Sequence, residues 1–594
     1  MMKVCYFIFF LFFAIAVHAQ VIPSVNRVEW FSAGYQPPTV SPRITVNVMD
    51  FGAKADGVSD NFLSFNNAVA SLNGHYGIVL VPAGTYLLQS GITFPDSVIF
   101  RGAGSNSTFI KINSTGTCFG MYGTGTNTFT PVVSGFHKDS KKITVGNAAL
   151  FEPGNSIELR QTNGTWDVMP AAWAVKVVGQ FTKITAIQGD TLFIEDKLRI
   201  DYDPMLNPEV QKIIPRKQVC IEYLNIARID TSTIAIGNAF EFSYAENCRV
   251  KGVESNKSMG SHCKVSLSSH IEITGSYFHD ANTYDGVGTK GYGIALDSHS
   301  GLCLITNTIF KHLRHAMMVK DGANGNVFAC NYSQSVYRNG TGEFPTDLAG
   351  DISLHGHYSY ANLFEENIVQ NIIVDETWGP SGPYNTFFRN RTEHYGIYMD
   401  ATRTNNSNFV GNEIIGSFLS GFYTITGTGN FLFGNNLNGT ITPGGTTPLN
   451  DVSCYLTVQP SFWNITDSWP ALGISNPLNG KTIPAKVGYL AGKYTDMPPV
   501  DTTTYLNDLF KDSITLYPNP ARGDVSVKYF SNGKDEVKIN IMDSEGKQVM
   551  KLDYLNNPIG NITRKINISV LSKGIYLVNV STEREKKELK LIVK

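Results

Sequence analysis

Apolar and polar residues alternate in short runs along much of the chain, a pattern that predicts β-strands. The clearest run covers residues 350–358, in which Ile352 and Leu354 alternate with polar residues. Because successive side chains of a strand leave opposite faces, one face of this strand is expected to be apolar. The other face is either simply solvated or carries chemistry. Its residues are Asp351, Ser353, His355 and His357.

A longer repeat links these strands between residues 300 and 440. An Asn-x-apolar pattern closes on a second Asn at positions 307, 331, 367, 390, 412 and 435, so the steps are 24, 36, 23, 22 and 23. A step of 22 to 24 is typical of one coil of a parallel β-helix. The recurring Asn predicts a ladder of stacked amides that bond from coil to coil. Extra residues at 337–350 and at 279–291 predict loops that wall a binding site.

Three regions depart from the repeat. Residues 136–200 contain short strands with Gly turns, which predict a small β subdomain inserted between coils. From about residue 455 the Asn repeat is lost and Pro and Thr increase, as expected for a cap and a linker. Residues 513–594 are short alternating strands that predict a β-sandwich. We therefore expect an all-β chain with a β-helix catalytic domain at 20–495, a linker at 496–512 and a separate C-terminal module at 513–594.

The N-terminus has the features of a secretory signal peptide over residues 1–19. Lys3 precedes an apolar run at 6–17, and Ala19 stands at the expected cleavage site. That run is too short for a spanning helix, and no later stretch is long enough. We therefore expect an exported, soluble protein without a transmembrane segment.

Composition narrows the choice of partners. A net charge of −2, with only 16% charged residues, gives no reason to expect nucleic acid or an anionic membrane as a partner. Seven cysteines remain after the signal peptide, an odd number without metal-ligand spacing. They are expected to be small buried core residues.

Short motifs within residues 46–110 add a resemblance. They are DFGA at 50–53, DGVSD at 56–60, PAGTY at 82–86 and GAG at 102–104. This region resembles the N-terminal part of the pectate-lyase-like superfamily of right-handed parallel β-helices, which includes polygalacturonase-type hydrolases, lyases, epimerases and phage tailspikes. The resemblance implies the fold but does not select the reaction. A helix at 61–72 is expected to cover the open end of the solenoid.

The C-terminal module carries a second resemblance, through YPNP at 517–520, LSKGIY at 571–576 and KLIVK at 590–594. These motifs resemble the C-terminal sorting domain of type IX secretion cargo. The resemblance implies recognition by the type IX machinery, passage across the outer membrane, and release from or attachment to the cell surface.

Aligning the coils on their Asn pairs collects titratable residues of five successive coils on one strip. The strip contains Asp297 and His299, Lys320 and Asp321, His355 and His357, Asp375 and Glu376, and Asp400. Our predicted catalytic residues are Asp351, His355, His357, Asp375, Glu376, Asp297 and Lys320. Our predicted substrate-binding residues are His299, Asp400, Arg389, Arg391, Trp378 and Tyr358.

Such a strip suits the cleavage of glycosidic bonds. Hydrolysis uses one carboxylic acid and one carboxylate, whereas elimination uses cations or a metal to neutralise a uronate and a base to remove its C5 proton. The excess of carboxylates favours hydrolysis, with elimination as the alternative and a non-catalytic glycan-binding surface protein as the third. We expect a monomer that acts on a polysaccharide without a cofactor. If the reaction is elimination, a calcium ion is the alternative expectation. The sequence allows two interpretations of Trp166, Trp173 and Arg160. They either border a carbohydrate cleft or fill the core of the inserted subdomain.

Overall fold

The computed structural model describes residues 21–234, 237–339, 349–399, 401–416, 422–473, 478, 480–498, 514–532, 536–555, 559–581 and 586–594. The chain forms two compact units, Met1–Met497 and Pro498–Lys594. The predicted signal peptide, Asp400, most of the predicted linker and residues 340–348 of the long loop lie outside the described residues.

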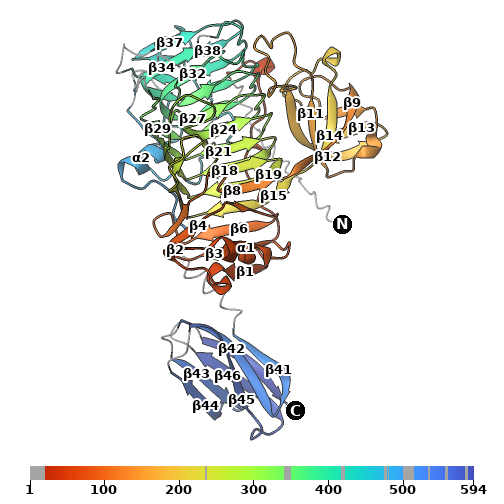
Figure 1. Ribbon diagram of the computed structural model, residues 1–594, viewed down its shortest axis with the longest axis vertical. Helices are drawn as coiled ribbons and strands as arrows, with labels where there is room; N and C mark the ends of the chain where they lie inside the picture. The colour runs from red at the N-terminus through yellow and green to blue at the C-terminus, as the bar shows by residue number, and fades with distance from the viewer. Residues whose placement is uncertain are drawn as a thin grey trace, which may run out of the picture. The chain divides into compact units, whose positions relative to one another are not determined.

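The first unit is a right-handed parallel β-helix whose described strands form two long sheets (Figure 1). The 13-stranded sheet includes β1 (Ile44–Asn47), β3 (Gly77–Val81), β6 (Val98–Gly102), β16 (Val219–Glu222), β19 (Ala245–Lys251), β22 (Ser269–Thr274), β25 (Leu304–Thr306), β28 (Val327–Ala329), β31 (Leu363–Glu365), β33 (Thr386–Phe388), β35 (Asn408–Val410) and β38 (Phe431–Phe433).

The 21-stranded sheet consists of two series of stacked strands. The two series are joined where a longer strand pairs with strands of both. One series, here called the β24 series, contains β5 (Ile92–Thr93), β8 (Phe119–Tyr122), β18 (Phe240–Ser243), β21 (Ser261–Ser266), β24 (Tyr292–Asp297), β27 (His315–Val319), β30 (Ile352–Leu354), β32 (Ile368–Val374), β34 (Arg391–Met399) and β37 (Phe422–Ile425). The other contains β2 (Asp56–Asp60), β4 (Gly84–Leu88), β7 (Thr108–Ile112), β17 (Asn225–Arg228), β20 (Glu254–Ser258), β23 (Tyr277–Ala281), β26 (Ile309–Lys311), β29 (Tyr332–Gln334), β36 (Glu413–Ile414), β39 (Asn435–Leu437) and β40 (Thr440–Thr442).

The helix predicted at 61–72 is confirmed as α1 (Phe62–Ala70), which lies at one end of the stack (Figure 1). Phe65 of α1 is fully buried, and its ring lies 5.4 Å from that of Tyr86 and 5.7 Å from that of Phe100. The helix therefore buries apolar side chains at the end of the solenoid, where the strands would otherwise meet water.

The predicted asparagine ladder is confirmed, with one exception. The side-chain amide of each Asn bonds the amide oxygen of the next at 2.9 to 3.1 Å, along Asn331, Asn367, Asn390, Asn412 and Asn435. Asn307 does not belong to the ladder, because the backbone N–H of Thr308 donates to Asn331 Oδ1 at that position. The interior also holds stacked Phe rings 4.8 to 5.3 Å apart, at Phe328, Phe364, Phe387 and Phe409.

The inserted subdomain is a closed barrel that extends beyond the expected 136–200, since its first and last strands lie outside that range. Its strands are β9 (Thr124–Ser134), β10 (Lys142–Val145), β11 (Ser156–Arg160), β12 (Gly179–Gln188), β13 (Thr191–Ile194) and β14 (Glu209–Ile214). The barrel lies along one flank of the coils (Figure 1). The carbonyl of Gly179 accepts hydrogen bonds from Tyr360 (2.6 Å) and Asn324 (2.9 Å) of the coils. These buried contacts fix the barrel against the helix.

A strap made of the described residues 449–473, 478 and 480–497, which includes α2 (Pro484–Leu490), runs over the coils and is held by buried ionisable groups. Arg389 donates to the carbonyl oxygens of Leu449, Asp451 and Leu472. Glu365 accepts from the Cys454 N–H (2.8 Å), and Glu366 accepts from the Ala471 N–H (2.6 Å). The strap is therefore fastened by one buried guanidinium group and two buried carboxyl groups.

These carboxyl groups make stability depend on pH. Burial raises the pKa of Glu365 to about 8 and that of Glu366 to about 7, whereas an unfolded Glu titrates near about 4.3. Between these limits the folded chain binds more protons than the unfolded chain, so stability falls as the pH rises.

We expect the melting temperature to fall between pH 5 and pH 8, and Glu365→Gln to reduce that fall. Calorimetry at both pH values measures it, with exposed Glu152→Gln as control; an equal fall in all three proteins would contradict the assignment.

The second unit is a β-sandwich of seven strands among the described residues. They are β41 (Thr515–Arg522), β42 (Asp524–Asn532), β43 (Val537–Met542), β44 (Gln548–Tyr554), β45 (Ile559–Asn567), β46 (Gly574–Ser581) and β47 (Lys586–Val593). Strand β41 pairs antiparallel with β42 and parallel with β47, which joins the two sheets at an edge. Alternate residues such as Val527, Ile541 and Val578 are buried between them.

The cysteines agree with the prediction for core residues, since six are buried and Cys454 is half-buried, all as free thiols. Among the described helices, none has the length and apolar character that a membrane crossing requires.

Candidate functional site

Four of the predicted residues stand in register on consecutive coils of the β24 series. Asp297 ends β24, and Lys320, His355 and Asp375 directly follow β27, β30 and β32. The backbone N–H groups of the last three repeat one bond to the coil before, with Lys320 donating to Leu296, His355 to Val319 and Asp375 to Leu354. Neighbouring positions are therefore about 4.8 Å apart. The prediction that these four share one strip is confirmed, and we call them the acid–base row.

His355 and Asp375 form a hydrogen-bonded pair within the row. His355 Nδ1 lies 2.8 Å from Asp375 Oδ2, and the other oxygen of Asp375 accepts from the Thr377 N–H at 2.9 Å. The carboxylate is buried, whereas 13% of the His355 side chain is exposed. Because the carboxylate accepts the Nδ1 proton, Nε2 of His355 becomes the nitrogen able to exchange a proton with a ligand.

Two carboxyl groups on neighbouring coils have different environments. Asp297 accepts a hydrogen bond from Ser266 Oγ and lies 3.8 Å from Lys264 Nζ. Asp321 is buried and accepts from Ser298 Oγ at 2.9 Å. Burial, together with the charge of Asp297, raises the pKa of Asp321 to about 6. Such a pair can hold one group as an acid beside a carboxylate.

Two exposed indole rings flank the row. Lys320 Nζ lies 4.9 Å from the centre of the Trp173 ring, which belongs to the barrel insertion. The Trp173 ring lies edge-on to that of Trp378 at 5.4 Å. These side chains remain 49% and 36% exposed, so each offers a flat apolar surface to a ligand.

Three other predicted residues hold the barrel instead of joining the row. His357 Nε2 lies 3.1 Å from the Met169 carbonyl oxygen, and burial lowers its pKa. The ring of Tyr358 packs 4.6 Å from that of Trp166. His299 Nε2 lies 2.8 Å from Glu158 Oε1 of the barrel, with both side chains buried.

The expectation of a long strand with a wet face at 350–358 is wrong. Strand β30 covers only three residues, and His357 adopts a left-handed turn conformation with φ of 43°. Asp351 is sealed, accepting from Ser333 Oγ (2.7 Å) and the Gln370 N–H (2.6 Å), and burial raises its pKa to about 6. Neighbouring coils and the barrel cover the face that the alternation left polar.

The remaining predicted residues lie away from the row or outside the described residues. Glu376 accepts a hydrogen bond from the backbone N–H of Arg403 at 2.7 Å. Arg391 pairs with Glu413 at 2.7 Å and donates to the Lys481 carbonyl oxygen. Arg389 fastens the strap, as described above. Both arginines are thus structural, and Asp400 lies outside the described residues.

Sequence reasoning did not select two residues that border the row: Lys264 and Asp321. Lys264 stands one coil before Asp297, and its coil lacks the Asn pair that set the alignment. Asp321 was counted in the strip but was not chosen as catalytic, because burial leaves no mark in a sequence. For Trp173 the sequence left a carbohydrate cleft and a subdomain core open; its exposed ring borders the row because the docking of the barrel brings it to Lys320.

No group of three or more His, Cys, Asp and Glu in the described part of the chain could hold a metal ion. The prediction of no cofactor, with calcium left open, stays a prediction.

Two regions of the chain match known family models. Residues 45–197 match the model described as rhamnogalacturonase A/epimerase, pectate lyase-like. Residues 515–594 match the secretion system C-terminal sorting domain. The first unit therefore contains a pectate-lyase-like region, and the second is a sorting domain of the type IX kind, as the motifs predicted.

Similarity to individual proteins is partial. A stretch of 67 residues, 11% of this chain, is 39% identical to the pre-neck appendage protein of Bacillus phage phi29 but spans only 7% of that protein. The tailspike protein gp49 of Pseudomonas phage LKA1 is 16% identical with a TM-score of 0.49, over 62% of this chain and 64% of that one. The tailspike of E. coli bacteriophage HK620, solved with a hexasaccharide, is 12% identical with a TM-score of 0.38, over 71% and 64% of the two chains.

Proposed function

We propose that this chain is an exported enzyme that cleaves the glycosidic bonds of a polysaccharide at the acid–base row, by hydrolysis. The observation that carries the proposal is the stacking of Asp297, Lys320, His355 and Asp375 on consecutive coils beside two exposed indole rings. Acid–base groups beside a flat apolar surface suit a sugar chain, whose rings stack on indoles while their oxygens exchange protons. The pectate-lyase-like match of residues 45–197 supports a polysaccharide as the substrate class.

Hydrolysis needs a proton donor for the leaving oxygen and a base for the attacking water. In our proposal Asp321 donates the proton, since its pKa of about 6 keeps it partly protonated near neutral pH. Asp297, which lies 3.8 Å from Lys264 Nζ, acts with burial to raise the pKa of Asp321 and so favours its protonated form. His355, oriented by Asp375, accepts the proton of the water through Nε2.

Elimination of a uronate-containing polymer remains the second candidate, because Lys320 and His355 stand on adjacent coils with Lys264 nearby. Cations in this arrangement could neutralise a uronate while one of them removes the C5 proton.

Product analysis separates these reactions. The purified protein is incubated with a panel of algal and plant polysaccharides, and the products are analysed by mass spectrometry and near-ultraviolet absorbance. Hydrolysis adds one water per bond cleaved and forms new reducing ends without that absorbance. Elimination forms an unsaturated, absorbing product with no added water. Binding without either product would overturn the enzyme proposal and leave a glycan-binding surface protein.

The exposed indole of Trp173 provides a prediction for substrate binding. Loss of one aromatic stacking contact costs about 0.5–1.5 kcal/mol beyond the lost contact area. We expect Trp173→Ala to raise KM about tenfold and to change kcat by less than about twofold, because stacking contributes equally before and during the reaction. Initial rates on the polysaccharide that the panel identifies measure both constants. Phe31→Ala, which removes an aromatic ring that is 72% exposed in the N-terminal segment, is the matched control; equal effects of the two variants would contradict the assignment.

The sorting-domain match of residues 515–594 supports export through the type IX machinery and action outside the cell. The signal peptide at 1–19 and the monomeric state stay predictions.

A further inference from the structure

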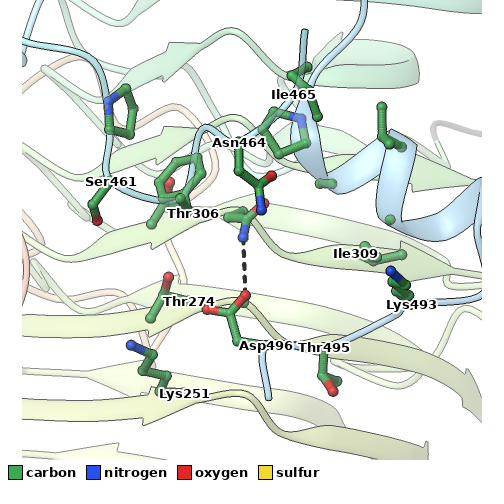
Figure 2. Close-up of a pocket in the computed structure, with 18 of the residues that line it drawn as sticks. Lys251, Thr274, Thr306, Ile309, Ser461, Asn464, Ile465, Lys493, Thr495 and Asp496 are labelled. Carbon is green, nitrogen blue, oxygen red and sulfur yellow. Dashed lines mark hydrogen bonds between the residues drawn. The ribbon is translucent and has the colours of Figure 1, made fainter. Parts of the chain in front are cut away.

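A large groove lies between the 13-stranded sheet and the strap, apart from the acid–base row, which belongs to the 21-stranded sheet (Figure 2). Its volume of about 860 Å³ falls in the upper part of the roughly 300–1,000 Å³ found for ligand sites. Residues of the first unit alone line it.

The floor of the groove has the periodicity of the coils. Lys251, Thr274 and Thr306 are paired in register on β19, β22 and β25, and all three line the space (Figure 2). Their spacing of about 4.8 Å per coil is close to the length of one sugar unit in an extended chain. A regular polymer of hydroxyl-bearing units could therefore meet the polar side chains of Lys251 and Thr274 at successive steps, whereas the Thr306 hydroxyl is buried.

The wall of the groove combines amide, carboxylate and aromatic groups from the strap. Asn464 is exposed, and Asp496 Oδ1 lies 3.4 Å from Asn307 Nδ2 (Figure 2). The ring of Tyr494 stacks on that of Tyr277 at 4.7 Å and remains 39% exposed. Stacking holds the Tyr494 ring in place while part of it stays open to a ligand, which lowers the entropy cost of binding.

The charges of the groove balance. Lys251 and Lys493 are its cationic residues, and Glu272 and Asp496 are its acidic ones. A groove built to select a polyanion would carry a clear excess of cations. Balanced charges, amides and hydroxyls instead supply donors and acceptors together, which suits a neutral ligand rich in hydroxyl groups.

We propose that this groove is a second, non-catalytic site that binds a neutral oligosaccharide or a neutral stretch of a polysaccharide chain. The site goes beyond the proposed enzymatic function and does not require it. Its position on the other sheet would let the protein hold one glycan strand while the acid–base row acts on another.

Binding can be tested separately from cleavage. The full chain carrying His355→Ala is titrated calorimetrically with hexasaccharides of β-1,4-linked glucose, xylose or mannose, and with the α-1,4-linked galacturonate hexamer as the charged comparison. At least one neutral hexasaccharide is expected to bind. Asn464→Ala and Tyr494→Ala should each weaken that binding at least tenfold, and Ser461→Trp, which places a bulky side chain in the groove, should abolish it.

Phe31→Ala, which removes an exposed ring outside both the groove and the acid–base row, is the matched control and should leave this binding unchanged, while Trp173→Ala reports on binding at the row. The proposal is overturned if no neutral hexasaccharide binds, if only Trp173→Ala weakens binding, or if the galacturonate hexamer binds more tightly with a strong salt dependence. Melting temperatures of all variants check folding, and Asn464→Ala keeps the test valid if Tyr494→Ala unfolds, because Asn464 is exposed. Cleavage by the unmodified chain is measured independently, so failure of one proposal leaves the other standing.

Discussion

Replacing His355 with alanine is expected to lower the turnover number about 10²–10⁴-fold, the usual contribution of a positioned acid–base group. His355 is the partly exposed member of a pair whose other member, Asp375, is buried 2.8 Å away. Removing the imidazole takes away the group proposed to activate water. It leaves Lys320 and the indole rings of Trp173 and Trp378 in place. Substrate affinity should therefore change far less than turnover, and initial rates on the identified polysaccharide measure both.

A matched histidine controls for that experiment. The side chain of His137 in the barrel insertion is 93% exposed, and His137→Ala should keep full turnover. Asp375→Asn adds a second test, because the amide no longer fixes the Nδ1 proton of His355 and the imidazole loses its orientation. It should lower turnover with a smaller change in KM. If His355→Ala kept more than half of the turnover, the row would not be the catalytic centre.

The winding of the chain explains why part of this row could be predicted from the sequence. The asparagine spacing sets the coil length, and the coil length brings Asp297, Lys320, His355 and Asp375 into one line. A register error of one residue mattered little for these four, since each lies at or just after the end of a strand. The same error gave Asn307 a ladder position that Thr308 occupies.

Burial and the docking of separate segments could not be predicted in this way. His357 and His299 lie within two residues of the row, yet they contact the barrel, whose position depends on contacts far apart in the sequence. Arg389 was considered for substrate, but the strap returns more than sixty residues later to cover it. Polar residues beside a strand thus belong either to a functional site or to the contact between two packed segments. Only the tertiary packing shows which of these roles a residue has.

The second large effect concerns the asparagine ladder, at its second residue Asn367. Its amide oxygen accepts from the backbone N–H (3.0 Å) and the side-chain amide (2.9 Å) of Asn331. Its own amide donates to the Phe328 carbonyl oxygen (2.8 Å) and to Asn390 Oδ1 (2.9 Å). All three asparagines are fully buried, so water cannot replace the lost partners.

Asn367→Ala is therefore expected to lower the free energy of unfolding of the first unit by about 3–5 kcal/mol, since each buried group left without a partner costs about 1–3 kcal/mol. Guanidinium denaturation followed by tryptophan fluorescence measures the change. Asn67→Ala, on the exposed side of α1, is the control and should stay within about 0.5 kcal/mol. A loss below about 1 kcal/mol at Asn367 would mean that the amides merely fill space. A loss in the expected range would mean that the ladder fixes the coil-to-coil register, and with it the alignment of the acid–base row.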